Sequence, residues 1–251
     1  MAGETTPSMR IAVIILHYGR PALAGRLYAQ ITGADPQYAE HVFVLDNCAP
    51  EPYPGAWRRT EHNLYWAGAL DYALCEMAQQ DYSHVWFLNN DLLFDGPPPY
   101  LRRAMGRLAR MEGTLGPVGI YAPAVTGNPY HPQMVAAPGM QYRTVEYVDG
   151  IAPLVSVACW QALGGVDYTG NPYGYGVDVW FSLCAHRAGW RVVVDHGVPV
   201  RHRYHSTARE ISGFMHTAAQ AEAAYLAARL GPDYRTVLAQ SARHWHDADS
   251  L

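Results

Sequence analysis

The chain of 251 residues contains no lysine, and all 18 of its basic residues are arginine. Lysine is essential to several kinds of site, so its absence excludes a Walker-type P-loop, a Schiff base with a substrate or pyridoxal phosphate, and a Ser-Lys dyad. An anionic ligand must therefore be held by arginine, by histidine, by backbone N–H groups or by a metal ion.

Charged residues and cysteines are also scarce. Only 16% of the residues are charged, the formal net charge is -4, and no long basic run occurs, so nucleic acid is not expected as the main partner. The four cysteines are Cys48, Cys75, Cys159 and Cys184. They show no CxxC spacing, so neither a zinc cluster nor a disulfide framework is expected. The G-x-S-x-G motif of serine hydrolases is missing too.

Long apolar runs are absent. No stretch approaches the roughly 20 apolar residues of a membrane-spanning helix, and the N-terminus lacks the hydrophobic region of a signal peptide. We therefore expect a cytoplasmic protein without a transmembrane segment. With 49% hydrophobic residues the chain can bury a large core. We expect a main domain over residues 1–210 and a C-terminal helical extension, residues 211–251, packed on the same domain.

Short apolar runs that end in polar side chains are the clearest structural pattern. Three such runs lie at residues 11–16, 42–45 and 85–88, and helical segments separate them. This alternation predicts an α/β fold with a mostly parallel sheet flanked by helices. Open sheets of this kind bind ligands beyond the carboxyl ends of their strands.

The third apolar run ends on Asn89, Asn90 and Asp91. The carboxylate of Asp91 suits a hard divalent cation such as Mn²⁺ or Mg²⁺, and the two amides suit a sugar or a phosphate oxygen. The alternative interpretation is a strand-to-loop turn that these side chains cap. The three residues alone do not decide between the two.

The second half of the chain contains two long loops and two helical segments. The loops, residues 126–142 and 167–176, are rich in glycine, proline and tyrosine, and loops of this length often bind ligands. The helices are expected at about residues 211–230 and 234–246. They could cover a cleft, pair two subunits into a homodimer or complete the core.

Histidine pairs late in the chain invite a comparison with zinc sites. The pairs are His202 with His205 and His244 with His246. Because no cysteine lies near them in the sequence, we do not expect a dedicated zinc site. For His202 two interpretations stay open, an accessory metal ligand or phosphate contact and an ordinary structural histidine.

The order of the motifs resembles the family 2 glycosyltransferases of GT-A fold, especially their bacterial rhamnosyltransferase-like branch. The motifs, in chain order over about residues 10 to 206, are HYGRP, DN, HNLYWAGALDYAL, FLNND, VDGIAPLVSVACWQALGGVD, YGYGVDVWFSLCAHRAGW and VRH. The resemblance implies a Rossmann-like GT-A domain. It also implies the transfer of a hexose from a nucleotide-sugar to an acceptor hydroxyl, with inversion and with a divalent cation as cofactor.

The resemblance implies a set of donor-binding residues. Asp46 matches an acidic residue that contacts the nucleotide base or ribose, and Asn63 matches the asparagine of an N-L-G motif that lines the nucleotide pocket. Asp91 ends the DXD-type motif and would bind the metal that the donor diphosphate chelates. The implied donor-binding residues are Tyr18, Arg20, Asp46, Asn63, Asp71, Asn89, Asn90, Asp91 and Arg201, with Arg203 or His205 as further help for the leaving group.

Catalytic and acceptor residues follow from the same resemblance. Asp178 matches the aspartate of the "ED" motif, the general base that takes the proton of the attacking hydroxyl, whose pKa is far above 7. His202 matches a histidine that completes the metal shell in some members. The implied acceptor-binding residues are Asp149, Tyr175 and Trp180. Acceptors in such families range over glycans, lipid carriers, proteins and small molecules, and the sequence does not identify the acceptor.

Some positions depart from the family pattern. Asn89 replaces the usual first aspartate of DXD, Val177 replaces the glutamate of "ED", and Tyr65 replaces the glycine after N-L. These departures leave open a catalytically inactive module that binds nucleotide or carbohydrate. A second enzyme alternative is a retaining transferase on the same fold, which needs no carboxylate on the acceptor side as base. A sugar nucleotidyltransferase is disfavoured, because HYGRP is no glycine-rich loop and lysine is missing.

Overall fold

The protein is described by a computed structural model that covers residues 9–127, 130–202 and 213–251. Its strands are β1 (Ile11–His17), β2 (Val42–Asp46), β3 (Arg58–Arg59), β4 (His84–Asn89), β5 (Leu92–Phe94), β6 (Val118–Val125), β7 (Tyr142–Val145), β8 (Leu154–Ser156), β9 (Arg191–His202) and β10 (His246–Ala248). Its α-helices are α1 (Pro21–Ala34), α2 (Tyr65–Ala78), α3 (Leu101–Leu115), α4 (Val157–Ala162), α5 (Val177–Arg187), α6 (Phe214–Leu230) and α7 (Tyr234–Ser241). Short 3-10 helices lie at Pro36–His41 and Pro132–Met134.

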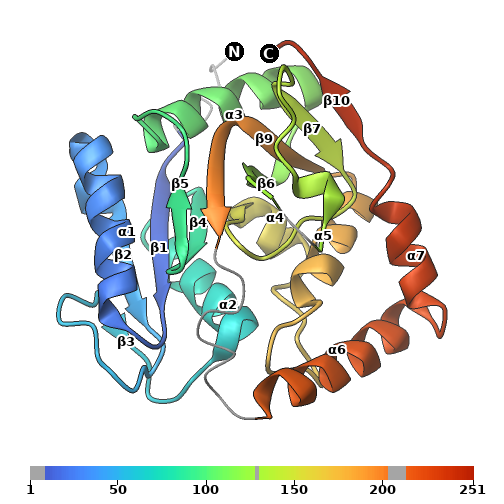
Figure 1. Ribbon diagram of the computed structural model, residues 1–251, viewed down its shortest axis with the longest axis horizontal. Helices are drawn as coiled ribbons and strands as arrows, with labels where there is room; N and C mark the ends of the chain where they lie inside the picture. The colour runs from blue at the N-terminus through green and yellow to red at the C-terminus, as the bar shows by residue number, and fades with distance from the viewer. Residues whose placement is uncertain (1–8, 128–129, 203–212) are drawn as a thin grey trace, which may run out of the picture.

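The strands form one large sheet, which confirms the predicted α/β fold. The strand order is β10-β7-β9-β6-β8-β4-β1-β2-β3, and β5 pairs with β9. The N-terminal strands β3, β2, β1 and β4 run parallel, as do β6 and β9, whereas the short strands β5, β7, β8 and β10 pair antiparallel. Helices α1, α2, α3, α4 and α5 pack on the sheet, and Figure 1 shows α6 and α7 along one side of the molecule.

The parallel register aligns the ends of three strands. Leu16 of β1 lies opposite Leu45 of β2 on one side and Asn89 of β4 on the other. The polar residues that follow β1, β2 and β4 therefore meet at one edge of the sheet, as the rule for open α/β sheets requires. The apolar parts of these strands, such as Ile14 and Phe87, are fully buried and form the core beneath that edge.

The C-terminal segment contributes to both the core and the sheet. Tyr225 and Leu226 of α6 are buried in the main hydrophobic core. The helix expected over residues 234–246 is shorter than predicted, because α7 ends at Ser241 and the chain then forms β10 on β7. The predicted boundary at residues 210 and 211 lies outside the described residues and stays a prediction. None of the helices in the described ranges has the length and apolar character that a bilayer span requires.

A buried ion pair joins α3 to β9. The Nε atom of Arg107 lies 2.8 Å from both carboxylate oxygens of Asp195, and neither side chain is more than one tenth exposed. The Tyr121 hydroxyl and the backbone N–H of Gly197 donate to the same carboxylate over 2.5 and 2.7 Å. Asp195 thus has a full set of partners in a site with little access to water.

We expect Arg107→Ala to lower the free energy of unfolding by about 3 to 5 kcal/mol, because it leaves the buried Asp195 carboxylate without its countercharge. Tyr121→Phe removes one hydrogen bond and should cost about 1.5 to 3 kcal/mol. Urea denaturation followed by circular dichroism measures both values. A loss below 1 kcal/mol for Arg107→Ala, roughly that of a surface change, would show that the pair does not stabilise the fold in this way.

Candidate active site

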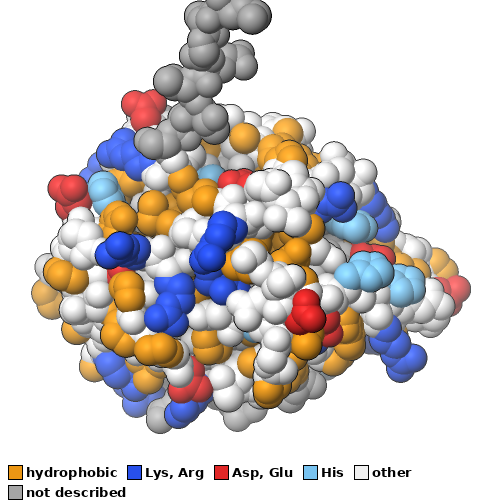
Figure 2. All heavy atoms as spheres, turned by 90° about the horizontal axis from the view of Figure 1, so that it is seen from above, with side chains coloured by type: hydrophobic (Ala, Val, Ile, Leu, Met, Phe, Trp, Pro, Cys, Tyr) orange, Lys and Arg blue, Asp and Glu red, His pale blue; other side chains and the backbone are white. Residues whose placement is uncertain are grey.

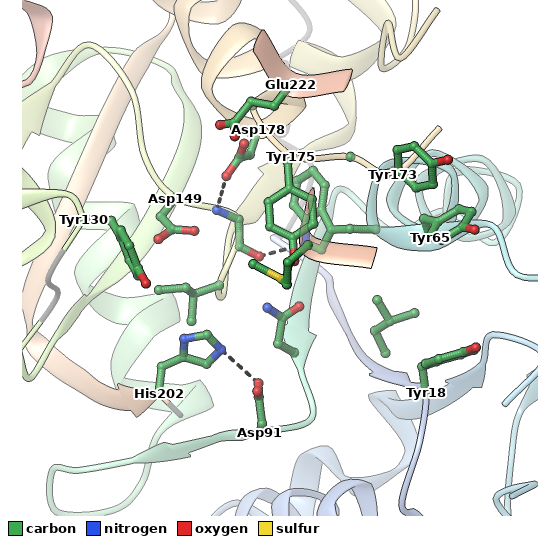
Figure 3. A pocket seen from close by; sticks show the side chains of 18 of the residues that line it. Tyr18, Tyr65, Asp91, Tyr130, Asp149, Tyr173, Tyr175, Asp178, His202 and Glu222 are labelled. Atoms are coloured by element: carbon green, nitrogen blue, oxygen red, sulfur yellow. Dashed lines mark hydrogen bonds and ion pairs between the residues drawn. The ribbon is translucent and has the colours of Figure 1, made fainter. Parts of the chain in front are cut away.

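A cavity of about 670 Å³ opens at the carboxyl ends of β1 and β4. Its volume is that of a typical small-ligand site. Figure 3 shows side chains from both halves of the chain pointing into it. The predicted site residues that line it are Tyr18, Asn63, Asn89, Asn90, Asp91, Asp149, Tyr175, Asp178 and His202. The structure thus brings the predicted metal ligands, the predicted base and five of the nine predicted donor residues into one cavity.

Asp91 and His202 meet on one side of the cavity. The Nε2 atom of His202 lies 2.9 Å from Oδ1 of Asp91, and both side chains are largely buried. The two residues lie close together because β5 pairs with β9: Leu92, the residue after Asp91, is the register partner of His202. The pairing of β5 with β9 therefore brings together two residues that are 111 positions apart in the sequence.

The pair fits the donor set of a divalent cation. Neighbouring ligand atoms of an octahedral ion are about 3 Å apart when each lies about 2.1 Å from the metal, which is close to the Asp91–His202 separation. A carboxylate with an imidazole suits Mn²⁺ better than it suits Ca²⁺. Among the described residues no group of three or more His, Cys, Asp or Glu side chains could hold a metal, so within that part of the chain the pair of Asp91 and His202 stands without a third ligand of these types.

Asn47 organises the wall beneath the start of α2. Its side-chain N–H donates to Oδ1 of Asn63 over 2.8 Å, and its side-chain Oδ1 accepts from the backbone N–H of Leu64 over 2.8 Å. Oδ1 of Asn63 also accepts from the backbone N–H of Tyr65, over 2.7 Å. Both asparagines line the cavity, so the DN and HNLY motifs form one hydrogen-bonded unit there.

Asp178 lies on the other side of the cavity, in the first turn of α5. Its Oδ2 accepts a hydrogen bond of 2.6 Å from the N–H of Gly150, whose carbonyl accepts one of 2.8 Å from Nε1 of Trp66. A helix N-terminus favours a carboxylate. Burial, helped by the nearby charge of Asp149, outweighs that effect and raises the pKa of Asp178 to about 6.

Three more ionisable side chains surround Asp178. Burial, followed by the charge of Asp178, raises the pKa of Glu222 to about 7. His131 lies 3.8 Å from the carboxylate of Asp149, and burial lowers the pKa of its imidazole. No arginine occurs among the lining residues that the structure describes, so this part of the cavity is strongly acidic.

Several lining residues were not identified from the sequence. His131 and Tyr130 belong to the loop 126–142, which was predicted to bind a ligand, but nothing in its composition singled out those two side chains. Phe214 and Glu222 come from α6, so this helix does line the cavity, one of the roles left open for it. An alanine-rich helical pattern gives no signal for such a contact.

Asp46 and Asp71 have structural partners and do not line the cavity. Asp46 is fully buried and accepts hydrogen bonds from the N–H groups of Ala49 and Tyr53, and it pairs with Arg59 over 2.7 Å. Oδ1 of Asp71 accepts from Nε1 of Trp160 and from a backbone N–H in the following loop. The donor contacts predicted for both residues thus have no support in this geometry.

Arg201 and Trp180 face away from the cavity for reasons of geometry. Side chains alternate along a strand, so His202 and Arg201 point to opposite faces, and Arg201 forms an exposed ion pair with Asp95 over 2.6 Å. Residues two apart on a helix do not share a face, so Trp180 diverges from Asp178. Its ring lies under the guanidinium of Arg187.

The remaining predicted contacts lie elsewhere. Arg20 is exposed at the start of α1 and is not a lining residue of the cavity. Arg203 and His205, which were predicted to help the leaving group, lie outside the described residues.

Comparisons with known sequences give relatives without an assigned function. No protein-family model matches the chain. The chain is 26% identical over 207 residues to the uncharacterized proteins Rv1525 of Mycobacterium tuberculosis (strain ATCC 25618 / H37Rv) and Mb1552 of Mycobacterium bovis. Each match covers 80% of this chain and 77% of the relative.

Comparisons with solved structures identify the fold. The mannosyltransferase PcManGT from Pyrobaculum calidifontis, in complex with GDP-Man and Mn²⁺, matches 94% of this chain and 80% of its own with a TM-score of 0.58 and 14% identity. GalNAc-T7 with UDP, GalNAc and Mn²⁺ matches 79% of this chain with a TM-score of 0.57 and 11% identity. That match covers 44% of GalNAc-T7, so this chain spans less than half of it. The chain has the GT-A-type fold of these glycosyltransferases.

Proposed function

We propose that the protein is a nucleotide-sugar-dependent glycosyltransferase that transfers a hexose to an acceptor hydroxyl with inversion. One observation carries this proposal. A single cavity at the strand ends has the Asp91–His202 pair on one side and Asp178 on the other, as Figure 3 shows. The GT-A-type fold supports the donor class, since the two solved neighbours contain UDP or GDP-Man with Mn²⁺.

Donor binding in this cavity depends on charge compensation. A nucleotide diphosphate is strongly anionic, yet the described lining residues include no arginine and several carboxylates. Asp91 and His202 would hold a Mn²⁺ or Mg²⁺ ion, which supplies a Lewis acid to stabilise the charge of the leaving diphosphate. Asn89 and Asn90 line the cavity beside them and offer amides to the donor's hydroxyl and phosphate oxygens.

Asp178 is the proposed general base. A carboxylate with a pKa near 6 is a stronger base than an ordinary aspartate and is still deprotonated at neutral pH. The N–H of Gly150 orients the carboxylate through Oδ2, and Trp66 fixes the Gly150 peptide from the other side. Asp178 takes the proton of the acceptor hydroxyl as that oxygen attacks the anomeric carbon, and in-line attack inverts the configuration.

The roles of Asp91 and Asp178 are separable by substitution. We expect Asp178→Asn to lower kcat by about a hundredfold or more, since it removes the proton acceptor, and to change the nucleotide-sugar affinity less than about threefold. Asp91→Ala should weaken Mn²⁺-dependent nucleotide-sugar binding by at least about tenfold, because it removes one of the two proposed ligands among the described residues.

Isothermal titration calorimetry and an assay of nucleotide release measure the two effects. Asp81→Asn, a change of an exposed carboxylate in the turn before β4, is the matched control. Equal loss of donor binding in both variants would contradict the assigned roles. Undiminished turnover in Asp178→Asn would instead favour a different base or a retaining mechanism, and an absence of turnover in the wild type would favour an inactive binding module.

The pH dependence of transfer should report the state of Asp178. Because the base must be deprotonated, kcat/KM for the acceptor should fall about tenfold per pH unit below an apparent pKa of about 6 and should level off above it. Asp149→Asn removes a negative charge that raises this pKa, so the acid limb should move to lower pH. A limb that stays in place or moves to higher pH would contradict the assignment.

A further inference from the structure

Tyr65 occupies a backbone conformation that normally selects glycine. Its φ angle is +52°, in the left-handed region where an L side chain is strained. The hydrogen bonds of Asn47 and Asn63 to its carbonyl and N–H hold the backbone in that bend. A tyrosine kept at such a position points to a use for its ring, since strained residues cluster at ligand sites.

The Tyr65 ring belongs to an aromatic wall of the cavity, which consists of Tyr65, Tyr173, Tyr175 and Phe214. Tyr65 and Phe214 are nearly parallel, at 7° with ring centroids 6.1 Å apart, and Tyr173 meets both edge-on at 5.1 and 5.7 Å. Tyr175 contacts Phe214 at 6.2 Å. All four rings are only partly buried, so they leave aromatic surface toward the cavity.

Three separate segments are held together to form this wall. Tyr65 begins α2, Phe214 begins α6, and Tyr173 and Tyr175 flank Gly174 in the loop before α5. Gly174 has a φ of +90°, and a Cβ there would come within 3.0 Å of the Ala67 backbone nitrogen. The loop therefore packs directly on the start of α2, which fixes the two tyrosines next to Tyr65.

The position of the wall assigns it to the acceptor. In the proposed reaction the acceptor hydroxyl must reach Asp178, and Figure 3 shows Tyr175 beside Asp178 and Glu222, with Tyr65 and Tyr173 farther along the same side. Burial, followed by the negative charges of Glu222 and Asp178, raises the pKa of the Tyr175 hydroxyl to about 12. A ring that lies against the wall would thus present its hydroxyls to the base.

The surrounding charges restrict the chemistry of this ring. Asp149 and Glu222 line the same end of the cavity and can accept hydrogen bonds from hydroxyl groups, whereas the negative charges of Asp149 and Asp178 repel an anionic group. An aromatic wall suits the apolar C–H face of a sugar ring. We propose, on the basis of the proposed function, that the aromatic wall is the acceptor subsite and that it takes an uncharged pyranose ring.

Ligand-observed NMR with simple glycosides tests this inference. The probes are the methyl pyranosides of glucose, galactose and mannose and the anionic methyl glucuronide, each with and without UDP or GDP and Mg²⁺. We expect at least one neutral pyranoside to bind, and the glucuronide to bind about tenfold more weakly or not at all. Tyr65→Gly and Phe214→Ala should each weaken the neutral pyranoside about tenfold.

Tyr65→Gly is the informative variant, because glycine relaxes the left-handed backbone while it removes the ring. Thermal unfolding of each variant tests whether the fold is kept. The control is Tyr168→Ala, which lies in the same loop as Tyr173 but outside the cavity lining.

Unchanged pyranoside binding in both wall variants, or no pyranoside binding to the wild type, would overturn the inference. Weakened nucleotide binding with intact pyranoside binding would also overturn it and assign the wall to the nucleobase. A wild type that binds pyranosides but no nucleotide would refute the proposed function and leave the sugar subsite standing.

Discussion

The Gly150 peptide is the contact on which the geometry of the cavity depends. Its carbonyl accepts from Trp66 at the start of α2, and its N–H donates to Asp178 at the start of α5. A Cβ at this position would lie 2.7 Å from the Trp66 ring and 3.2 Å from the Asp178 carboxylate, so only glycine fits without displacing both. The residues after Gly150 run along β4, where the backbone carbonyl of Ile151 accepts a hydrogen bond from the N–H of Asn89. The peptide therefore fixes the candidate base relative to β4, the strand that leads into the candidate metal ligand Asp91.

The cavity combines two environments that suit different chemistry. Near the ends of β4 and β9, Asp91 and His202 form a compact pair that fits a cation and, through it, an anionic diphosphate. Near α5 and α6 the cavity is lined by three carboxyl groups, those of Asp149, Asp178 and Glu222, and none of the described lining residues is arginine. This environment favours an uncharged partner. Figure 2 shows arginine side chains on the outer surface of the molecule seen from above. The division matches a reaction with an anionic donor and a neutral acceptor.

The sequence was sufficient to predict the fold and the strand-end residues, but not the direction of every side chain. Short apolar runs identify the strands, and the strand-end rule places Asn89, Asn90 and Asp91 at the ligand edge whatever the details of packing. Whether the side chains of Arg201 and Trp180 point into the cavity depends on strand alternation and on helix phase. The sequence does not locate the cavity, so it could not give these directions. Glu222 and Phe214 line the cavity because α6 packs against it. This is a long-range contact, and no local sequence pattern signals it. Asp46 was found at the expected strand end, but its carboxylate is satisfied by Arg59 and the following loop.

The most direct test of the central claim is calorimetric titration of the wild-type protein with UDP-, GDP- and dTDP-sugars, first with Mn²⁺ and then with excess EDTA. If the Asp91–His202 pair holds the cation that binds the donor diphosphate, one class of nucleotide-sugar will bind with Mn²⁺ and will lose that binding in EDTA. Binding of equal strength in EDTA, or no binding of any of these donors to the folded protein, would contradict the account.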